Sequence, residues 1–196
     1  MQIEKTPLKD CLIIKPRVFE DDRGSFFESF NEETFQKETG LEVNFVQDNQ
    51  SISKKGTLRG FHLQKGEHAQ AKLVRVIKGE VMDVVVDLRE GSETFGETFS
   101  IILNEQNNHQ LFVPRGFGHA FITIADEAIF AYKCDNYYNK ASEAGIIYDD
   151  KDLGIDWQLA KDELIISDKD LVLPRSFAGC NSLCAIVSGC NSFRMQ

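Results

Sequence analysis

The stretch Glu80-Val81-Met82-Asp83-Val84-Val85-Val86-Asp87 is the part of this chain that indicates its fold class most clearly. Its valine-rich composition favours an extended strand. The run is apolar enough to predict burial on both faces of a packed sheet. Directly before it, Lys78-Gly79 predicts a tight turn from the preceding strand. The stretch therefore predicts a layered β structure.

Short β-rich runs separated by Gly, Asn and Asp fill most of the remaining sequence. We expect strands at 43–46, 71–77, 79–88, 98–103, 110–113, 120–124 and 128–133. One short helix is expected at 31–38, with Asn31 as its N-cap and Gly40 as its stop. Many short strands at regular spacing are typical of an all-β protein. We expect a jelly-roll barrel or sandwich with a few short peripheral helices.

Length and charge limit the classes of function. The 196 residues fit one domain with a substantial core. The formal net charge of -9 argues against general affinity for nucleic acid, because a duplex backbone would be repelled. A small anionic ligand remains compatible with an acidic protein, because a local group of Arg and Lys side chains can bind it.

The location of the protein is predicted from its apolar runs and its cysteines. Residues 1–10 are polar and charged, without the apolar run of a signal peptide, and no apolar stretch reaches the length of a bilayer span. The five cysteines are an odd number without paired metal-ligand spacing. Cys11 and Cys134 lie in apolar contexts, which predicts buried, inert thiols. We therefore expect a cytoplasmic protein that does not associate with membranes.

The last part of the chain differs from the rest. The sequence Gly179-Cys180-Asn181-Ser182 recurs as Gly189-Cys190-Asn191-Ser192. Two copies are too few for a solenoid, which needs several stacked units. We expect one domain over residues 1–175 and a C-terminal tail of unknown role over residues 176–196, weakly structured or exchanging a strand.

Residues able to carry chemistry are densest in Leu58-Arg59-Gly60-Phe61-His62-Leu63-Gln64. On a regular strand Arg59 and His62 point to opposite faces. A bend or bulge at Gly60 would bring them to one face, and bulges often mark functional sites. Lys72 follows within an apolar strand. Pattern alone favours an ammonium that reaches an edge over one that points into a polar cavity.

A second motif, Pro114-x-Gly116-x-x-His119, delivers a histidine at the start of a strand. It resembles the second motif of the cupin jelly-roll superfamily. In metal-bearing cupins the partner motif supplies His-x-His, whereas this chain has His62-x-Gln64. One expected imidazole is therefore an amide, and we expect no metal site.

Tyrosines and carboxylates make up the remaining candidates. Tyr132, Tyr137 and Tyr138 lie on or just after an expected strand, where a single tyrosine is usually an amphipathic filler at a barrel rim. Asp168 and Asp170 stand in a segment that alone is typical of a helix cap or a turn.

Further motifs occur in order along the chain. They are Arg23-Gly24-x-Phe26-x-Glu28-x-Phe30, Gln47-Asp48-Asn49-x-Ser51, Gln70-Ala71-Lys72-Leu73-Val74, Asp83-Val84 with Asp87-Leu88-Arg89, Ser92-x-Thr94-Phe95-Gly96, Tyr132-Lys133, Glu143-x-Gly145-Ile146, Asp149-Asp150, Ile155-x-Trp157 and Ser167-x-Lys169-Asp170. From about residue 2 to about residue 175 the chain resembles the dTDP-4-dehydrorhamnose 3,5-epimerases, a metal-free branch of the cupin fold.

The resemblance implies a role for each matching residue. His62 would be the general base, paired with Asp170, and Tyr132 would be the acid on the opposite face of the sugar. Lys72 would lie near the ketone oxygen. The remaining matches are substrate-binding positions, with the basic ones serving the diphosphate and Tyr138 stacking on thymine: Arg23, Phe26, Glu28, Gln47, Asn49, Arg59, His119, Tyr138, Glu143 and Lys169.

The implied substrate is a dTDP-4-keto-6-deoxy sugar, inverted at C3 and C5 through an enolate without a cofactor. The family also implies a homodimer that exchanges N-terminal strands. Two alternatives share the fold. One is an epimerase acting on a single carbon, or a ketoisomerase, on a related sugar. The other is a metal-dependent cupin enzyme or a non-catalytic sugar-binding cupin. The sequence does not separate one inverted carbon from two, because side chains packed around the pocket set the orientation of the sugar ring.

Overall fold

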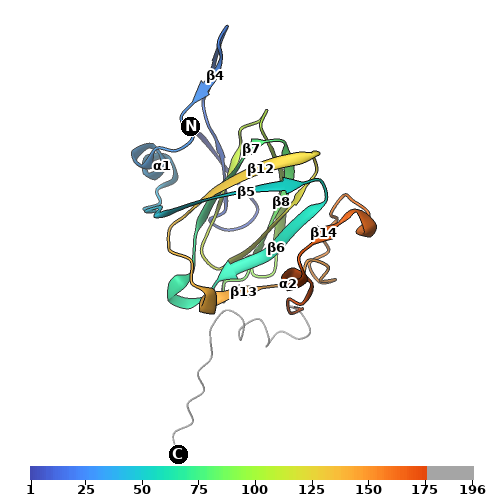
Figure 1. The fold of residues 1–196 in the computed structure, drawn as a ribbon. Helices are drawn as coiled ribbons and strands as arrows, with labels where there is room; N and C mark the ends of the chain where they lie inside the picture. The colour runs from blue at the N-terminus through green and yellow to red at the C-terminus, as the bar shows by residue number, and fades with distance from the viewer. Residues whose placement is uncertain (176–196) are drawn as a thin grey trace, which may run out of the picture.

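The computed structural model describes residues 1–175, which form two packed β-sheets with short helices at the periphery (Figure 1). The strands are β1 (Gln2–Lys5), β2 (Leu12–Lys15), β3 (Val18–Asp21), β4 (Gly24–Phe27), β5 (Gln47–Lys54), β6 (Thr57–Gln64), β7 (Lys72–Lys78), β8 (Glu80–Asp87), β9 (Thr98–Asn104), β10 (Gln110–Val113), β11 (Phe117–Thr123), β12 (Glu127–Cys134), β13 (Glu143–Gly145) and β14 (Ile165–Ile166). The helices are α1 (Glu32–Thr39) and α2 (Asp168–Leu171), with 3-10 turns η1 (Gly66–His68), η2 (Lys140–Ser142) and η3 (Lys161–Glu163).

The first sheet has the strand order β1-β2-β10-β7-β12-β5. The second has the order β13-β6-β11-β8-β9, and β14 pairs with β6 in parallel. Every other pair is antiparallel. Strands that are neighbours in a sheet are often distant in sequence, so the chain passes repeatedly between the two layers. The all-β sandwich expected from the sequence is confirmed.

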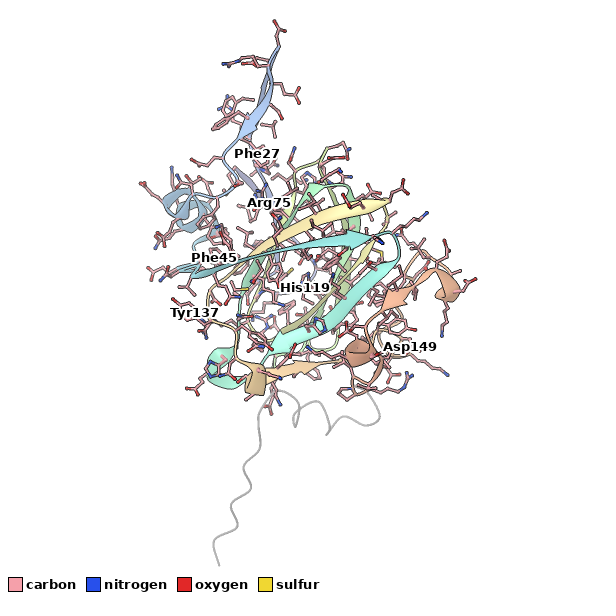
Figure 2. All side chains as sticks on the ribbon, viewed as in Figure 1. Phe27, Phe45, Arg75, His119, Tyr137 and Asp149 are labelled. Carbon is pink, nitrogen blue, oxygen red and sulfur yellow. The ribbon has the colours of Figure 1, made fainter. Side chains whose placement is uncertain are left out.

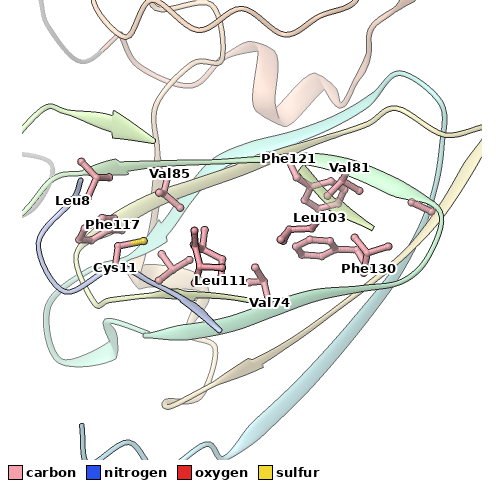
Figure 3. Packing of buried hydrophobic residues seen from close by; sticks show 14 residues of the cluster. Leu8, Cys11, Val74, Val81, Val85, Leu103, Leu111, Phe117, Phe121 and Phe130 are labelled. Atoms are coloured by element: carbon pink, nitrogen blue, oxygen red, sulfur yellow. The ribbon is translucent and has the colours of Figure 1, made fainter. Parts of the chain in front are cut away.

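Strand β8 is buried on both faces, as its sequence predicted. Val81 and Val85 point between the sheets, where they meet side chains such as Val74 and Phe130 of the first sheet (Figure 3). Val84, on the other face of β8, belongs to a second apolar cluster beneath the C-terminal segment. Such two-sided burial explains why the strand reads as a continuous apolar run.

The helix and the turn after β7 also agree with the sequence. The Asn31 side chain accepts a hydrogen bond from the backbone N–H of Thr34, and Gly40 ends the helix with φ 72°. Phe35 of α1 is buried against Phe112 of the first sheet. Gly79 has φ +79° in the turn between β7 and β8, as expected for a glycine at that position.

Strand β5 is the main difference from the expected elements. A strand was expected at 43–46, but those residues belong to no strand, although the Val46 N–H donates to the Cys134 carbonyl at 2.9 Å, and β5 begins at Gln47. Its alternate residues Asn49, Ser51 and Ser53 face inward although they are polar. Apolar alternation therefore failed as a signal, because this strand faces a polar cavity.

The hairpin of β3 and β4 pairs only with itself and projects away from the sandwich (Figure 1). At its base the Arg75 guanidinium lies 6.0 Å from the ring centre of Phe27, on the outer side of the first sheet (Figure 2). At its far end the Phe26 ring is 71% exposed. The expected tail at 176–196 lies outside the described residues. Within residues 1–175 no helix is long and apolar enough to cross a bilayer.

Candidate active site

A cavity of about 340 Å³ lies between the two sheets and is polar on most sides. The first sheet contributes Gln47, Asn49, Gln50, Ser51, Lys72, Phe130 and Tyr132; the second contributes Arg59, His62, Leu63, Gln64, His119, Phe121 and Glu143; Gln70 and Tyr138 complete the lining. A larger surface depression of about 820 Å³ lies around residues 148–164. It contains none of the residues predicted for the site, so the inter-sheet cavity is the candidate active site.

An extra residue in β6 brings Arg59 and His62 to the same cavity. His119 of β11 pairs with His62, but Phe121, two positions on, pairs with Arg59, three positions back. Gly60 occupies this bulge with φ +126°, and a Cβ atom there would lie 2.5 Å from the Cβ of Ala120. Only glycine fits both the backbone conformation and the contact. The predicted bulge is confirmed.

His62 is held by a buried carboxylate. Its Nε2 lies 2.6 Å from Oδ1 of Asp170, at the start of α2. Burial alone would raise the pKa of Asp170, but the hydrogen bond and charge of His62, with the backbone N–H of Gly60, outweigh burial and lower it. Asp170 is therefore ionised near neutral pH, and its carboxylate accepts a hydrogen bond from the Nε2–H of His62. Nδ1 of His62 is left to exchange a proton with a ligand.

Tyr132 enters the same cavity from the opposite sheet. It lies on β12, two positions after the buried Phe130. Burial raises the pKa of Tyr132, a Cys134 thiolate would raise it further, and the Arg59 guanidinium opposes the rise. The side chain is therefore a neutral phenol that can donate a proton. A ring bound between the sheets would meet His62 on one face and Tyr132 on the other.

Lys72 points into this cavity from β7, so the interpretation that its ammonium reaches an edge was wrong. Its Nζ lies 6.0 Å from the ring centre of Tyr132. Burial lowers the pKa of Lys72, because the ammonium loses its hydration. Among residues 1–175 no carboxylate forms an ion pair with it. The site thus holds a cation without a direct counter-ion, placed to meet negative charge on a ligand.

A second histidine pair was not predicted. His119 lines the cavity, and its Nε2 lies 2.8 Å from Oδ2 of Asp83, which is fully buried. His119 was expected at the site, whereas Asp83 was missed. An ionisable residue in the middle of the apolar β8 was the available signal. Ser51, also missed, had the polar alternation of β5 as its signal.

Polar groups at the mouth of the cavity are joined by hydrogen bonds and an ion pair. The Gln47 amide donates to Asn49 at 3.0 Å and accepts from the backbone N–H of Tyr138 at 3.1 Å. The Tyr138 hydroxyl donates to Glu143 at 3.2 Å, and Lys169 donates to the same carboxylate. Burial tends to raise the pKa of Glu143, but the Lys169 ammonium outweighs it and the pKa is lowered. The half-exposed Tyr138 ring is left free to contact a planar group.

Five predicted site residues do not line this cavity. Asp170 and Lys169 contact lining residues, His62 and Glu143 respectively, whereas the other three lie away from it. Arg23, Phe26 and Glu28 belong to the β3–β4 hairpin and the segment that follows it, and none of them lines the cavity. Arg23 is largely exposed and pairs with Asp21 at 2.5 Å. Within residues 1–175 the hairpin pairs with no other strand, and it does not cover the cavity of its own chain.

The position that is histidine in metal-bearing cupins has a structural task here. The Gln64 Oε1 accepts a hydrogen bond from the backbone N–H of Asn139 at 3.0 Å. Across residues 1–175 no three His, Cys, Asp or Glu side chains come together as a set of metal ligands.

The fold is a cupin-type jelly roll, and its inter-sheet cavity holds the His62–Asp170 pair together with Tyr132 on the facing sheet. The family model of dTDP-4-dehydrorhamnose 3,5-epimerase matches residues 5–176. The chain belongs to this family of isomerases, and the epimerase function expected from its motifs is confirmed.

Individual relatives agree with this assignment. The dTDP-4-dehydrorhamnose 3,5-epimerase of Methanothermobacter thermautotrophicus is 52% identical over 85% of this chain and 89% of its own length. The crystal structure of the Elizabethkingia anophelis enzyme has a TM-score of 0.86 and 55% identity over 89% of this chain and 95% of its own. The Legionella pneumophila epimerase, solved with dTDP-4-keto-L-rhamnose, has a TM-score of 0.85 and 43% identity over 88% of this chain and 91% of its own.

Proposed function

We propose that the cavity binds dTDP-4-dehydro-6-deoxy-D-glucose and inverts C3 and C5 to give dTDP-4-dehydro-L-rhamnose, with His62 as base and Tyr132 as acid. The observation that carries these roles is their placement in one cavity on opposite sheets. Inversion needs a proton removed from one face and returned to the other. The keto sugar in the Legionella relative supports the ligand class.

The chemistry begins at the carbon beside the ketone. Nδ1 of His62 takes its proton, and the electrons of the C–H bond move to the ketone oxygen to form an enolate. Asp170 stabilises the imidazolium that results. The Lys72 ammonium stabilises the enolate oxygen where its charge develops, an effect that is often the largest part of catalysis. Tyr132 then protonates the carbon from the other face, and solvent resets both groups.

Residues around the mouth hold the nucleotide. The Arg59 guanidinium, which donates to Ser53 at 3.2 Å, keeps further N–H groups for the diphosphate. Tyr138 is placed to stack on thymine, with its hydroxyl fixed by Glu143 and that carboxylate held by Lys169. Gln47 and Asn49 bind polar groups of the ligand from β5.

In a homodimer, a second copy would bring Arg23, Phe26 and Glu28 to each cavity. Phe26 is exposed on a projecting hairpin, and the outer face of the first sheet exposes Ile52. Burying both against a second copy would remove apolar surface from water. We place Arg23, Phe26 and Glu28 of one copy at the cavity of the other, consistent with the N-terminal exchange that the family resemblance implies. Cys11 and Cys134 are free thiols, which supports a reducing, cytoplasmic location.

Deuterium uptake tests the roles of base and acid. In heavy water, His62→Ala should abolish exchange at both carbons and slow product formation by about 10²–10⁴. Tyr132→Phe should still exchange on the original face, because the base remains, while inversion slows sharply. NMR of the recovered sugar locates the label, and label at only one carbon in the parent would indicate a single-carbon epimerase. Near-parental exchange by His62→Ala would place the base elsewhere.

Mixed dimers test the shared site. His62→Ala and Arg23→Ala should each be impaired as pure dimers. In a refolded equimolar mixture, one site of each hybrid would combine an intact His62 with an intact Arg23 from the other copy. Random pairing should then restore about one quarter of the parental sites. If the activity of the mixture equals only the mean of the two variants, Arg23 acts in its own chain or not at all.

A further inference from the structure

Asp83 is an unusual residue for its position. It stands between Val81 and Val85 on the inward face of β8 and is fully buried. Its Oδ2 accepts from His119 at 2.8 Å, while its Oδ1 is buried without a hydrogen-bond partner among the described residues. A buried carboxylate with an unsatisfied oxygen is destabilising. A functional reason for keeping it is therefore worth seeking.

Lys72 is a second buried charge at this site, of the opposite sign. It is a buried cation with no direct counter-ion in the described chain, yet the proposed mechanism needs its positive charge. The ionisable groups around it are Tyr132 and Cys134 on β12, His62 and Arg59 on β6, His119 on β11, Glu143 on β13, Tyr138 at the mouth, and Asp83 on β8. An anion among these groups would keep Lys72 protonated.

Lys72 and Asp83 lie on facing inner surfaces of the two sheets, because Lys72 is two positions before the inward Val74 on β7 and Asp83 lies between the inward Val81 and Val85 on β8. Asp83 and Cys134 both favour the charged form of Lys72. Burial lowers the pKa of Lys72, while Cys134 and Asp83 act in the opposite direction. Cys134 acts only as a thiolate, and burial raises the pKa of its thiol. At neutral pH Cys134 is therefore uncharged, which leaves Asp83 as the acidic group that supports Lys72.

We propose that Asp83 is a positioning residue with two effects: it fixes the ring of His119 against the cavity, and it keeps Lys72 as an ammonium before substrate arrives. Because the carboxylate accepts a hydrogen bond from the Nε2–H of His119, the second ring nitrogen is left for the sugar. The first effect holds a ligand contact, and the second supplies the cation for the enolate. This inference rests on the proposed role of Lys72 in catalysis.

The protonation of Lys72 can be measured without any reaction. Protein labelled with [13Cε]lysine gives an NMR titration for each ammonium, and Lys72→Met identifies the signal of Lys72. In the parent, Lys72 should be protonated at pH 7. Asp83→Asn should shift its titration to lower pH, whereas Cys134→Ser should leave it unchanged. A neutral Lys72 in the parent, or a shift in Cys134→Ser but not in Asp83→Asn, would overturn the proposal. The parental titration remains decisive if Asp83→Asn does not fold.

Kinetics provide the second measurement. Asp83→Asn should lower kcat at pH 7 by about 10- to 100-fold, because Lys72 loses charge but stays in place. KM should change by less than about twofold, since the amide oxygen of the Asp83→Asn variant can still accept from His119 and the nucleotide contacts are remote. The alkaline limb of kcat should move to lower pH. An equal loss of kcat at every pH would show a merely structural role. Failure of the parent to epimerise would instead reject the proposed function, with the NMR titration unaffected.

Discussion

Gly60→Ala should damage stability and activity together. At φ +126° an alanine backbone costs about 1–3 kcal/mol. The new methyl group would lie 2.5 Å from the Ala120 Cβ and 2.6 Å from the His119 carbonyl oxygen, overlaps that cost about 1–3 kcal/mol more. The free energy of unfolding in urea should fall by about 2–6 kcal/mol. Displacing His62 by about 1 Å should lower kcat/KM about 100-fold.

A substitution at a second glycine separates the backbone cost of a positive φ from the steric overlap at the bulge. Gly91 also has a positive φ, +76°, but a Cβ atom there would meet nothing within 4 Å. Gly91→Ala should therefore cost only the backbone preference, about 1–2 kcal/mol, with parental kcat/KM. Both variants are compared by urea unfolding and by steady-state kinetics on the same preparations. Parental stability and activity in Gly60→Ala would refute the claim that the bulge places Arg59 and His62.

Two further predictions concern the buried network after β8 and the diphosphate. Asp87 is fully buried and accepts from Arg89, Ser92 and Thr94. Asp87→Asn should lower the free energy of unfolding at pH 7 by about 3 kcal/mol. Burial would raise the pKa of Asp87, but those hydrogen bonds lower it, so its stabilisation is present above the ordinary Asp pKa and lost as pH falls through the lowered value. The difference between parent and variant should shrink in acid, as urea unfolding at several pH values would show. Arg59→Ala should weaken dTDP binding by about 2 kcal/mol in calorimetry, and unchanged affinity would remove Arg59 from the phosphate site.

Much of the fold was predictable because the sequence pattern of each segment agrees with how that segment packs in the fold. Strand β8 is apolar on both faces because both faces pack, and helix α1 has Asn31 and Gly40 at its ends for reasons of backbone hydrogen bonding. The glycine between Arg59 and His62 predicted the bulge by strand geometry alone. Each of these signals depends on a few neighbouring residues, so sequence was enough.

The site was less accessible, because its polar side chains contradict the apolar pattern that marks strands. Asn49 and Ser51 face inward on β5, so alternation failed to locate that strand. Lys72 was misread for the same reason, since an inward lysine needs a cavity that no local pattern reveals. Only the family motifs pointed to these residues, and although the motifs included Asp83, they implied no role for it.

The arrangement also separates chemistry from nucleotide binding. His62 and Tyr132, the proposed base and acid, lie on strands that are paired on both sides within their sheets, so packing fixes their distance and relative orientation. Arg23, by contrast, lies in the turn of a hairpin that pairs with no other strand of residues 1–175. Acid–base transfer tolerates little displacement, whereas an exposed guanidinium can adjust to a phosphate. A second copy is therefore well suited to supply binding groups and poorly suited to supply the base or the acid. In this chain the proposed base and acid accordingly lie on paired strands of the sandwich, and the proposed phosphate-binding Arg23 lies on the projecting hairpin.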